Sequence, residues 1–412
     1  MAQKLKFGNG TWATKKGSTL AYNDENNNYK PLPFSFTRDS IATRVNKEGL
    51  IEVVGNNKPR IDYKDSAEGV FLLEKASTNL LTHSSELTNS SWVKTNTGTG
   101  SAPSITSNYS ISPDGTQNAD RVIFNLNGGT ANGDISQVSV TIGSVSSASY
   151  TNSVYIKSNT ANNYDLVVTD PSGGHIIKNI STEWQRFDNP RENVTNASFR
   201  IRLRGDEGTS DYADVSIWGA QLEQQSFVTS LINTSGSTVQ RAAETASGAG
   251  NSEVFNDSEG VLFAEINLIY NQSGRYITLG DGTSSNRIIL GTEGGDDRII
   301  FYVIVGGNVQ CQIPYILPDI NAIYKIAIKY KQNDFALWVN GLEVGTDTSG
   351  STLASNTLSK LVFNGGTGTS NFYGKTKELG YYNTALTDAE LEYMTSYRSL
   401  NELVTELNLN EL

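Results

Sequence analysis

The stretch 214-DVSIWGAQLEQQSFVTSLINTSGSTVQRAAE-244 decides the fold class of this chain. Its first residues alternate, with Val215 and Ile217 on one face and their neighbours on the other, which is the period of a half-buried strand. The chain then turns at Gly219 and reaches residues 234–238, a polar run that lacks large apolar side chains. Short strand-like segments precede and follow this stretch. We therefore expect it to end one β-domain and to begin the connection to a second.

The composition supports an all-β protein of more than one domain. The chain has 412 residues, of which 37% are hydrophobic and only 18% are charged. A chain of this length exceeds one ordinary hydrophobic core. Much of the remainder is Gly, Ser, Thr and Asn, which suit strands and turns better than helices. We predict tandem antiparallel β-sandwiches with an extended N-terminal region and a short C-terminal helix.

The charge and the apolar runs limit the possible partners. A formal net charge of −11 argues against binding to a nucleic-acid backbone. No apolar run approaches the length that spans a membrane, and the start MAQKLKFGNG has no apolar core of a secretory signal. Cys311 is the single cysteine, so no internal disulfide can form. We expect synthesis in a reducing cytoplasm and no membrane or nucleic-acid partner.

The C-terminal third contains the clearest local signals. Residues 324–330 alternate between apolar and basic or small side chains, as a strand with one buried face does. Asn340-Gly341 then supplies the two positive φ angles of a type I′ hairpin turn. Further on, Thr387 and Glu390 have the spacing of a helix capping box. These signals predict a second sandwich that is complete in itself and closes with a helix.

Several short motifs lie before and after the first predicted sandwich. They are Thr37-Arg38, Pro59-Arg60-Ile61-Asp62-Tyr63, Leu72-Leu73-Glu74, Gly219-Ala-Gln-Leu-Glu223 and Arg241-Ala-Ala-Glu244. In this order they resemble blocks of bacteriophage head-fibre and tail-fibre proteins, where they flank a jelly roll like that of carbohydrate-binding modules. The segment YKIAIKYKQNDFALWVNGLEV at residues 324–344 is similar to the central hairpin of concanavalin A-like, laminin-G-type lectin domains.

The resemblance implies an order of five segments. They are an extended virion-attachment region at 1–87, a carbohydrate-binding-module-like jelly roll at 88–233, a linker at 234–250, a concanavalin A-like lectin domain at 251–397 and a short amphipathic helix at 398–412. It also implies a homotrimer on the virion surface that contacts other capsid or tail proteins through its N-terminal region.

The function implied is adhesion to a host-surface or environmental polysaccharide. Two alternatives stay open: a purely structural capsid or tail component, and a glycan depolymerase. Sandwich glucanases place their carboxylates in a Glu-x-Asp-x-x-Glu strand, and no Glu-x-Asp occurs in this chain. No Cys or His cluster has metal-ligand spacing. We therefore expect no enzyme activity and no cofactor, with calcium as the one ion considered.

Candidate binding residues follow from the chemistry of sugars, which present an apolar face and a rim of hydroxyl groups. Aromatic rings beside amides are the side chains that match such a ligand. The candidates for carbohydrate binding are Trp92, Tyr164, Asn162, Asn163, Trp184 and Trp338. Asp296 and Asp297, which follow two glycines, are candidates for calcium, and a plain acidic turn is the alternative.

Overall fold

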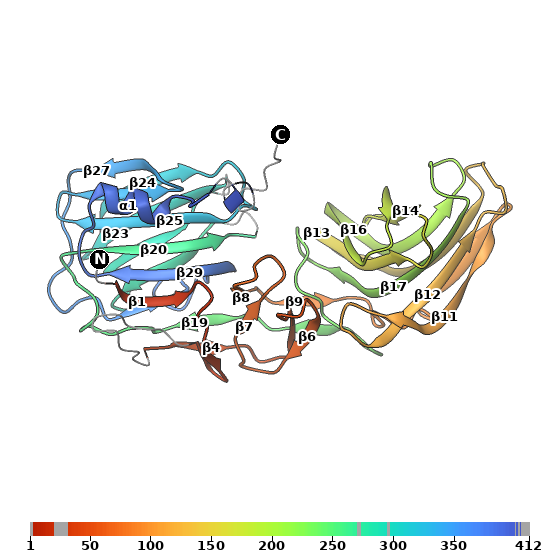
Figure 1. The fold of residues 1–412 in the computed structure, drawn as a ribbon, viewed down its shortest axis with the longest axis horizontal. Coiled ribbons are helices and arrows are strands. Elements are labelled where there is room, and N and C mark those ends of the chain that lie inside the picture. Colours follow the sequence, from red (N-terminus) through yellow and green to blue (C-terminus); the bar gives the residue numbers. More distant parts are fainter. Residues whose placement is uncertain are drawn as a thin grey trace. The chain divides into compact units, whose positions relative to one another are not determined.

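The computed structural model describes residues 3–19, 32–269, 273–294, 297–399, 401–402 and 404. These residues form antiparallel sheets and one short helix, so the predicted all-β class is confirmed (Figure 1). The chain divides into two units, each assembled from separate stretches of sequence. The first unit comprises Met1–Asp39, Val54–Lys75 and Ala243–Leu412, and the second comprises Ser40–Val53 and Ala76–Ala242.

The first unit is a sandwich with one large sheet, in the order β27-β26-β25-β20-β29-β8-β7, in which β1 also pairs with β29. Its strands are β1 (Gln3–Gly8), β7 (Arg60–Asp62), β8 (Val70–Leu73), β20 (Glu259–Asn267), β25 (Tyr324–Lys331), β26 (Phe335–Val339), β27 (Leu342–Asp347) and β29 (Gly374–Tyr382). The second sheet, β24-β23-β22-β21-β28, contains β21 (Arg275–Gly280), β22 (Arg287–Thr292), β23 (Arg298–Val305), β24 (Asn308–Ile316) and β28 (Lys360–Val362). A small sheet contains β2 (Thr14–Lys15), β3 (Ser18–Thr19), β4 (Phe34–Thr37) and β19 (Thr245–Ser247).

Alternation along the central strands separates the two faces of the large sheet. Leu262 and Ala264 of β20 point into the main core, as do Ile326 and Ile328 of β25. The positions between them point outward, where Phe263 joins a separate apolar cluster under the C-terminal helix. A strand with this period buries one row of side chains and leaves the other for a different use. The outward row is the one that builds the candidate site.

The predicted hairpin and helix cap are both confirmed. Asn340 and Gly341 have φ angles of 49° and 84° and join β26 to β27. Helix α1 (Asp388–Thr395) begins at the N-cap Thr387, whose side chain accepts from the Glu390 backbone while the Glu390 side chain accepts in return. Each signal is local, since both partners of each contact lie within a few residues of one another.

The N-terminal region differs from the extended attachment segment that we expected. Leu5 and Phe7 of β1 are buried in the core of the first unit, and so are Phe34 and Phe36 of β4. The rings of Phe34 and Phe363 lie 4.9 Å apart between centroids. These residues alternate as a strand requires, so they supply part of a core whose other side chains come from residues beyond 243. The sandwich expected over 251–397 is therefore not complete in itself.

The second unit is built on one eight-stranded antiparallel sheet, in the order β11-β12-β17-β13-β16-β14-β15, in which β10 also pairs with β13. The strands are β10 (Val93–Thr97), β11 (Ser101–Ile111), β12 (Gln117–Asn125), β13 (Ile135–Ser158), β14 (Tyr164–Thr169), β15 (His175–Ile180), β16 (Gln185–Arg204) and β17 (Tyr212–Glu223). The start of β13 pairs with β10 and its end pairs with β17, while β16 follows it along most of its length. The two long strands thereby wrap the sheet around one apolar core.

Strand β17 does not end at Gly219, where we expected a turn. It continues to Glu223, and Gly219 has a φ of 63° at a register shift between β17 and β13. A side chain there would also approach Tyr155 and Leu231 at 3.2 and 3.3 Å, so glycine suits both the backbone and the space. The polar residues that follow are buried, because Glu223 accepts hydrogen bonds from Ser77, Gln221 and Thr229.

The segment 234–250, expected as a linker, contains two short strands. In the second unit β18 (Val239–Arg241) pairs with β9 (Ser77–Asn79), and in the first unit β19 pairs with β4. Ala246 and Ala249 are completely buried in the first unit. The Ser, Thr and Gly content of residues 234–250 did not indicate these strands, because their pairing partners lie far away in the sequence. The remaining short sheet of the second unit pairs β5 (Ala42–Val45) with β6 (Ile51–Val54).

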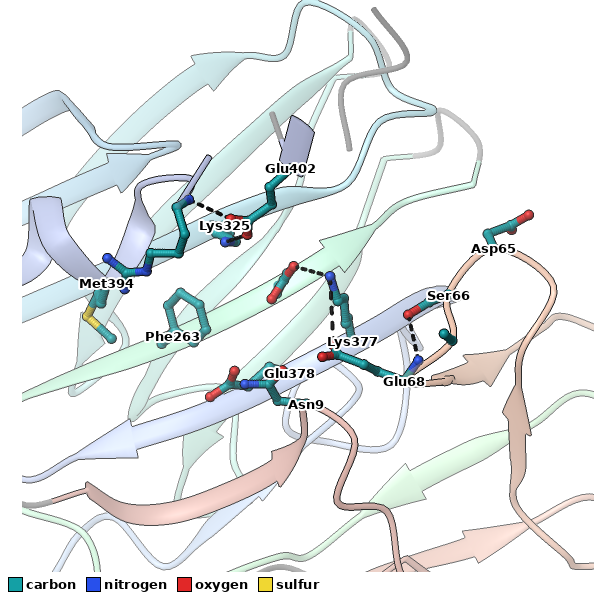
Figure 2. A pocket seen from close by; sticks show the side chains of 13 residues that line it. Asn9, Asp65, Ser66, Glu68, Phe263, Lys325, Lys377, Glu378, Met394 and Glu402 are labelled. Carbon is teal, nitrogen blue, oxygen red and sulfur yellow. Dashed lines mark hydrogen bonds and ion pairs between the residues drawn. The ribbon is translucent and has the colours of Figure 1, made fainter. Parts of the chain in front are cut away.

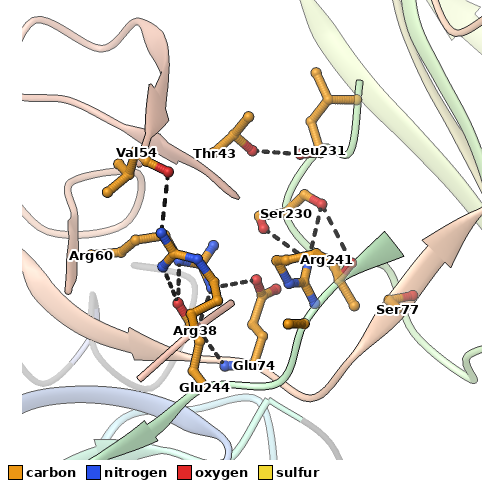
Figure 3. A network of polar contacts seen from close by, with 12 residues as sticks. Arg38, Thr43, Val54, Arg60, Glu74, Ser77, Ser230, Leu231, Arg241 and Glu244 are labelled. Atoms are coloured by element: carbon orange, nitrogen blue, oxygen red, sulfur yellow. Dashed lines mark hydrogen bonds and ion pairs between the residues drawn. The ribbon is translucent and has the colours of Figure 1, made fainter. Parts of the chain in front are cut away.

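Four of the five motifs that carry the resemblance to fibre proteins contribute to a buried ion cluster in the first unit; Gly219–Glu223 lies in the second unit. Arg38 donates to Glu244 at 2.7 Å, and Arg60 bridges Glu244 and Glu74 at 2.8 Å from each (Figure 3). The side chains of Arg38, Arg60 and Glu244 are fully buried. Buried charges are tolerated only when they are paired with one another. The fold of the first unit therefore requires these arginine and glutamate residues at these positions.

Most of the amphipathic helix predicted at 398–412 lies outside the described residues. Among those that are described, Asn401, Glu402 and Val404 are helical. In the described part of the chain, no helix combines the length and the apolar character needed to cross a membrane.

Candidate functional site

A polar cleft lies on the outer face of the large sheet in the first unit (Figure 2). Its volume is about 540 Å³, which is in the range of small-molecule sites. Strands β20, β25 and β29 form the floor, while loops near residues 9 and 65–68 and the segment after α1 form the rim. The lining residues are Asn9, Asp65, Ser66, Ala67, Glu68, Phe263, Glu265, Lys325, Lys377, Glu378, Met394, Arg398 and Glu402.

Three charged side chains form a row across the floor of the cleft. Glu265 of β20 is directly opposite Lys325 of β25 on one side and Glu378 of β29 on the other. Facing residues of antiparallel strands project to the same side of a sheet, with Cβ atoms about 5 Å apart. The row is therefore fixed by strand register.

A β-bulge adds a fourth charge to the same face. The register of β20 and β29 shifts after Glu265, so that Lys377 and Glu378 together oppose one residue of β20. A bulge of this kind directs two consecutive side chains to one face, against the alternation of a regular strand. Lys377 Nζ consequently lies 3.1 Å from Glu265 Oε1.

The turn after β1 closes one side of the cleft. Gly8 has a φ of 91°, and a Cβ at this position would lie 2.1 Å from the carbonyl oxygen of Lys377. Asn9 follows with a φ of 50°, and its backbone N–H donates to the same carbonyl at 2.8 Å. Glycine and asparagine are the residues that tolerate such angles best. This turn brings the Asn9 amide to the rim.

The charges of the cleft compensate one another. Lys325 forms an ion pair with Glu402, and Lys377 lies between Glu265 and the more distant Glu68. Burial raises the pKa of Glu378 above its usual range, although Lys6, 3.7 Å away, acts in the opposite direction. Burial also acts to raise the pKa of Glu402, but the hydrogen bonds from Lys325 and from the Arg398 backbone outweigh it and lower that pKa.

An apolar surface continues from the cleft to the helix. Phe263 and Met394 line the cleft, and both belong to the cluster that packs Leu386 and Leu391 against the outer face of the sheet. The helix covers one part of this face, and the charged row lies beside it at the floor of the cleft. Phe263 is only 4% exposed, so the apolar group that the cleft offers is the half-buried Met394. The cleft thus combines this thioether with carboxylate, ammonium and amide groups.

Two of the aromatic residues predicted to bind carbohydrate lie in the core of the second unit. Trp92 is 1% exposed, contacts Phe199, and donates its indole N–H to the His83 carbonyl at 2.9 Å. Tyr164 is 7% exposed, and its hydroxyl lies 2.8 Å from that of Thr160. Neither ring offers a free face to a ligand in this conformation, and their binding role stays a prediction.

The other candidates in the second unit are more accessible. Asn162 and Asn163 are exposed in the turn before β14, where Asn163 donates to Asn179 at 3.1 Å. Trp184 is half-buried, its indole N–H donates to the Ile111 carbonyl, and Lys157 lies 5.3 Å from its ring. These three residues do not join the cleft, which belongs to the first unit.

The remaining candidates lie in the first unit but outside the cleft. Trp338 is 6% exposed beneath α1 with Leu386 and Leu391. Asp297 is half-buried, and its carbonyl accepts from the Leu317 backbone at 2.8 Å, while Asp296 lies outside the described residues. Among the residues described, no group of three or more His, Cys, Asp and Glu side chains could hold a metal ion. Calcium binding there stays an untested expectation.

Sequence reasoning missed the residues of the cleft. Glu265 and Lys325 have the appearance of solvated positions in alternating strands. The bulge at Lys377 and Glu378 has no sequence signal, because it arises only when β29 is paired with β20. The one available signal was the pair Gly8-Asn9, which suggests a tight turn without indicating what it approaches.

Comparison with protein-family models identifies one match, to the concanavalin A-like lectin/glucanases superfamily over residues 262–392. This range covers most of the large sheet of the first unit together with α1. The chain is therefore similar to this superfamily over about a third of its length, including the floor of the cleft. A search of curated proteins found no match.

Solved structures with partial similarity include several carbohydrate-binding proteins. Domain 4 of an extracellular arabinanase from Geobacillus stearothermophilus, in complex with arabinotriose, is 14% identical over 37% of this chain and 73% of its own, with a TM-score of 0.31. The CBM40 of the Ruminococcus gnavus IT-sialidase, bound to α2,3-sialyllactose, is 15% identical. The match covers 35% of this chain and 86% of the CBM40 chain, with a TM-score of 0.31. Domains LG4-5 of the mouse laminin α1 chain are 11% identical. The match covers 75% of this chain and 95% of the laminin chain, with a TM-score of 0.25. At these scores the similarities carry no conclusion about function.

Proposed function

We propose that this chain binds carbohydrate through the cleft of the first unit and does not cleave it. The observation that carries the proposal is one cleft in which carboxylate, ammonium and amide groups lie beside the half-buried Met394 side chain. Sugars present an apolar face and a rim of hydroxyl groups, and each hydroxyl can both donate and accept. The match of residues 262–392 to a lectin and glucanase superfamily supports the same ligand class.

The proposal is tested on the full-length protein with a glycan array, followed by calorimetry on the glycans bound. Glu378→Gln and Asn9→Gly each remove one polar group of the cleft, and glycine accepts the positive φ of Asn9. We expect each variant to weaken binding about tenfold, the effect of losing one hydrogen bond between the ligand and the half-buried carboxyl group of Glu378 or the exposed amide of Asn9. Glu343→Gln, the same change at an exposed residue of β27 in the same sheet, serves as the control. Unchanged affinity in both cleft variants would refute this site.

We further propose that binding serves adhesion by a bacteriophage fibre of the head or tail, assembled as a homotrimer on the virion surface. The support for this setting is the sequence resemblance of the motifs around Arg38, Arg60 and Glu244. A purely structural role among capsid or tail proteins remains the alternative. Particles that carry a Glu378→Gln variant should assemble normally and adsorb less well to host cells, whereas a structural component would show no change in adsorption.

A second function is favoured by one specific feature, the facing carboxylates of Glu265 and Glu378. Retaining glycoside hydrolases hold two carboxyl groups about 5 Å apart, one of them protonated at neutral pH. The raised pKa of Glu378 fits the acid. The side chain of Glu265 is only 6% exposed and lies 3.1 Å from Lys377, which fits an ion pair better than a nucleophile. We expect no release of reducing ends from host polysaccharides; release that Glu378→Gln abolishes would establish a hydrolase.

A further inference from the structure

A second surface with the chemistry of a glycan site lies on the second unit, on the outward face of β11, β12 and β17. Inward side chains of these strands, Val122, Phe124 and Val215, belong to the core. The neighbouring positions point outward, and they include Tyr109 and Tyr212, which are 44% and 40% exposed. Each ring keeps apolar area in contact with water, which a stacking ligand can cover.

The two tyrosine rings are held by their neighbours. Arg121 lies over the ring of Tyr109 at 4.9 Å from its centroid, and Tyr164 contacts Tyr212 edge-on at 6.3 Å between centroids. Arg121 also pairs with Asp214, which lies two residues after Tyr212 on β17 and therefore on the same face of the strand. Rings fixed in this way lose little conformational entropy when a ligand stacks on them.

A network of hydrogen bonds fixes the polar groups between the rings. Arg121 donates from Nε to Asp214 at 2.9 Å and makes a second hydrogen bond from its terminal nitrogen. Asn159 donates to the same carboxylate at 2.9 Å and accepts from Ser216 at 2.7 Å. Guanidinium and amide groups with fixed orientation are the donors that select ligand hydroxyls.

The charge of this face selects among possible ligands. The bidentate contact between Arg121 and Asp214 neutralises both groups, so the face carries no net charge from them. A polyanion would in addition be repelled by a chain with a net charge of −11. A protein partner would require a broad apolar centre, whereas polar groups separate the aromatic rings here. An uncharged, hydroxyl-rich polymer fits best.

We propose that Tyr109, Arg121 and Tyr212 form a second carbohydrate-binding surface for a neutral polysaccharide. This inference rests on the proposed function, glycan binding, and adds a site of its own on the other unit. Two separate sites on one chain can engage one polymer together and gain affinity from their linkage.

The test uses the full-length protein and a panel of neutral polysaccharides (xylan, arabinan, galactan, β-glucan and dextran), with heparin as the polyanion, in affinity electrophoresis. Tyr109→Ala and Tyr212→Ala should each weaken binding of the retained polymer about tenfold, the loss expected for one stacking aromatic side chain. Tyr109→Phe keeps the ring and should bind nearly as well as the wild type. Ile316→Ala, at a 63% exposed residue of β24 in the second sheet of the first unit, is the control for loss of an exposed apolar side chain. Thermal unfolding confirms that each variant is folded.

The outcomes separate this inference from the proposed function. Loss of binding in the tyrosine variants but not in Glu378→Gln would support the second surface and refute the cleft. The reverse pattern would overturn the second surface and leave the cleft standing. Failure of the wild type to bind any polymer of this panel would overturn the second surface alone, because the cleft is tested separately on the glycan array. Preferential retention by heparin would overturn the neutral class. A change in oligomer mass caused by Tyr109→Ala, with polysaccharide binding intact, would assign this face to a subunit interface and overturn the inference.

Discussion

Glu265 and Glu378 occupy directly facing positions on β20 and β29 and project from the same face of the large sheet. Two carboxylates so close would repel each other if both were ionised without compensation. Lys377 lies 3.1 Å from Glu265, and burial raises the pKa of Glu378. The pair therefore divides into a carboxylate held by Lys377 and a carboxyl group whose pKa is raised by burial, although Lys6 lies 3.7 Å from it.

This division predicts how stability depends on pH. A carboxyl group whose pKa is raised on folding stabilises the native state below its ordinary pKa, and this contribution is lost as the pH rises through the raised value. Glu378→Gln cannot ionise and should not show this loss. We expect the free energy of unfolding of the variant, relative to the wild type, to increase as the pH rises above about 4, the ordinary pKa range of a glutamate.

Urea denaturation at a series of pH values measures this difference. Glu343→Gln is the control, because Glu343 is exposed and an identical change there should give a difference that is independent of pH. A constant or decreasing difference for Glu378→Gln would mean that the carboxylate of Glu378 is stabilised in the folded protein, in contradiction to the proposed division.

Local contacts explain which parts of the fold could be predicted from the sequence. The hairpin at Asn340-Gly341 and the capping box of Thr387 and Glu390 each depend on residues a few positions apart, and both are confirmed. The alternation of apolar and basic residues in β16 can also be recognised in the sequence. Phe199 and Ile201 enter the core, while Arg200 between them does not. In each case one short window of sequence contained all the information.

Pairings between distant segments explain what could not be predicted. The partner of β29 is β1 on one side, more than three hundred residues earlier in the chain, and no local pattern specifies that register. The bulge that sends Lys377 and Glu378 to the same face exists only after β29 has paired with β20. The cleft depends on both features, so its residues could not be distinguished from solvated charges in the sequence.

The buried ion cluster predicts a strong dependence of stability on Glu244. Its carboxylate accepts from both Arg38 and Arg60, whose guanidinium groups are fully buried. Glu244→Ala would leave these two cations without their shared partner, and loss of one member of a buried ion pair costs about 3–5 kcal/mol. Chemical denaturation should show a decrease of this size in the free energy of unfolding.

The matched control for this prediction is a surface ion pair of the same unit. Lys331 lies 3.4 Å from Glu259, and these side chains are 51% and 29% exposed. Lys331→Ala should cost less than about 1 kcal/mol, the usual range for exposed pairs. Similar costs for Glu244→Ala and Lys331→Ala would show that the buried cluster contributes no more than a surface contact.

The proposed trimer predicts the mass of the protein in solution. Closed cyclic assemblies are the rule among homo-oligomers, and the fibre resemblance implies a threefold one. Light scattering on the full-length chain should therefore give three times the chain mass of 44.7 kDa. A monomer at micromolar concentration would exclude a stable trimer, and a dimer would exclude threefold symmetry.

The N-terminal strands predict the behaviour of a truncated chain. In the first unit β1 and β8 both pair with β29, and Phe36 and Phe71 contribute to the core. A fragment of residues 251–412 would lose these strands and expose both the edge of the large sheet and part of its apolar face. Burying a phenylalanine side chain contributes about 2–3 kcal/mol, so the loss of several exceeds the stability of an ordinary domain. We expect the fragment to lack a cooperative thermal transition and to aggregate, while the full-length chain unfolds cooperatively. A folded, monomeric fragment would mean that the sandwich is complete without the strands that precede residue 75.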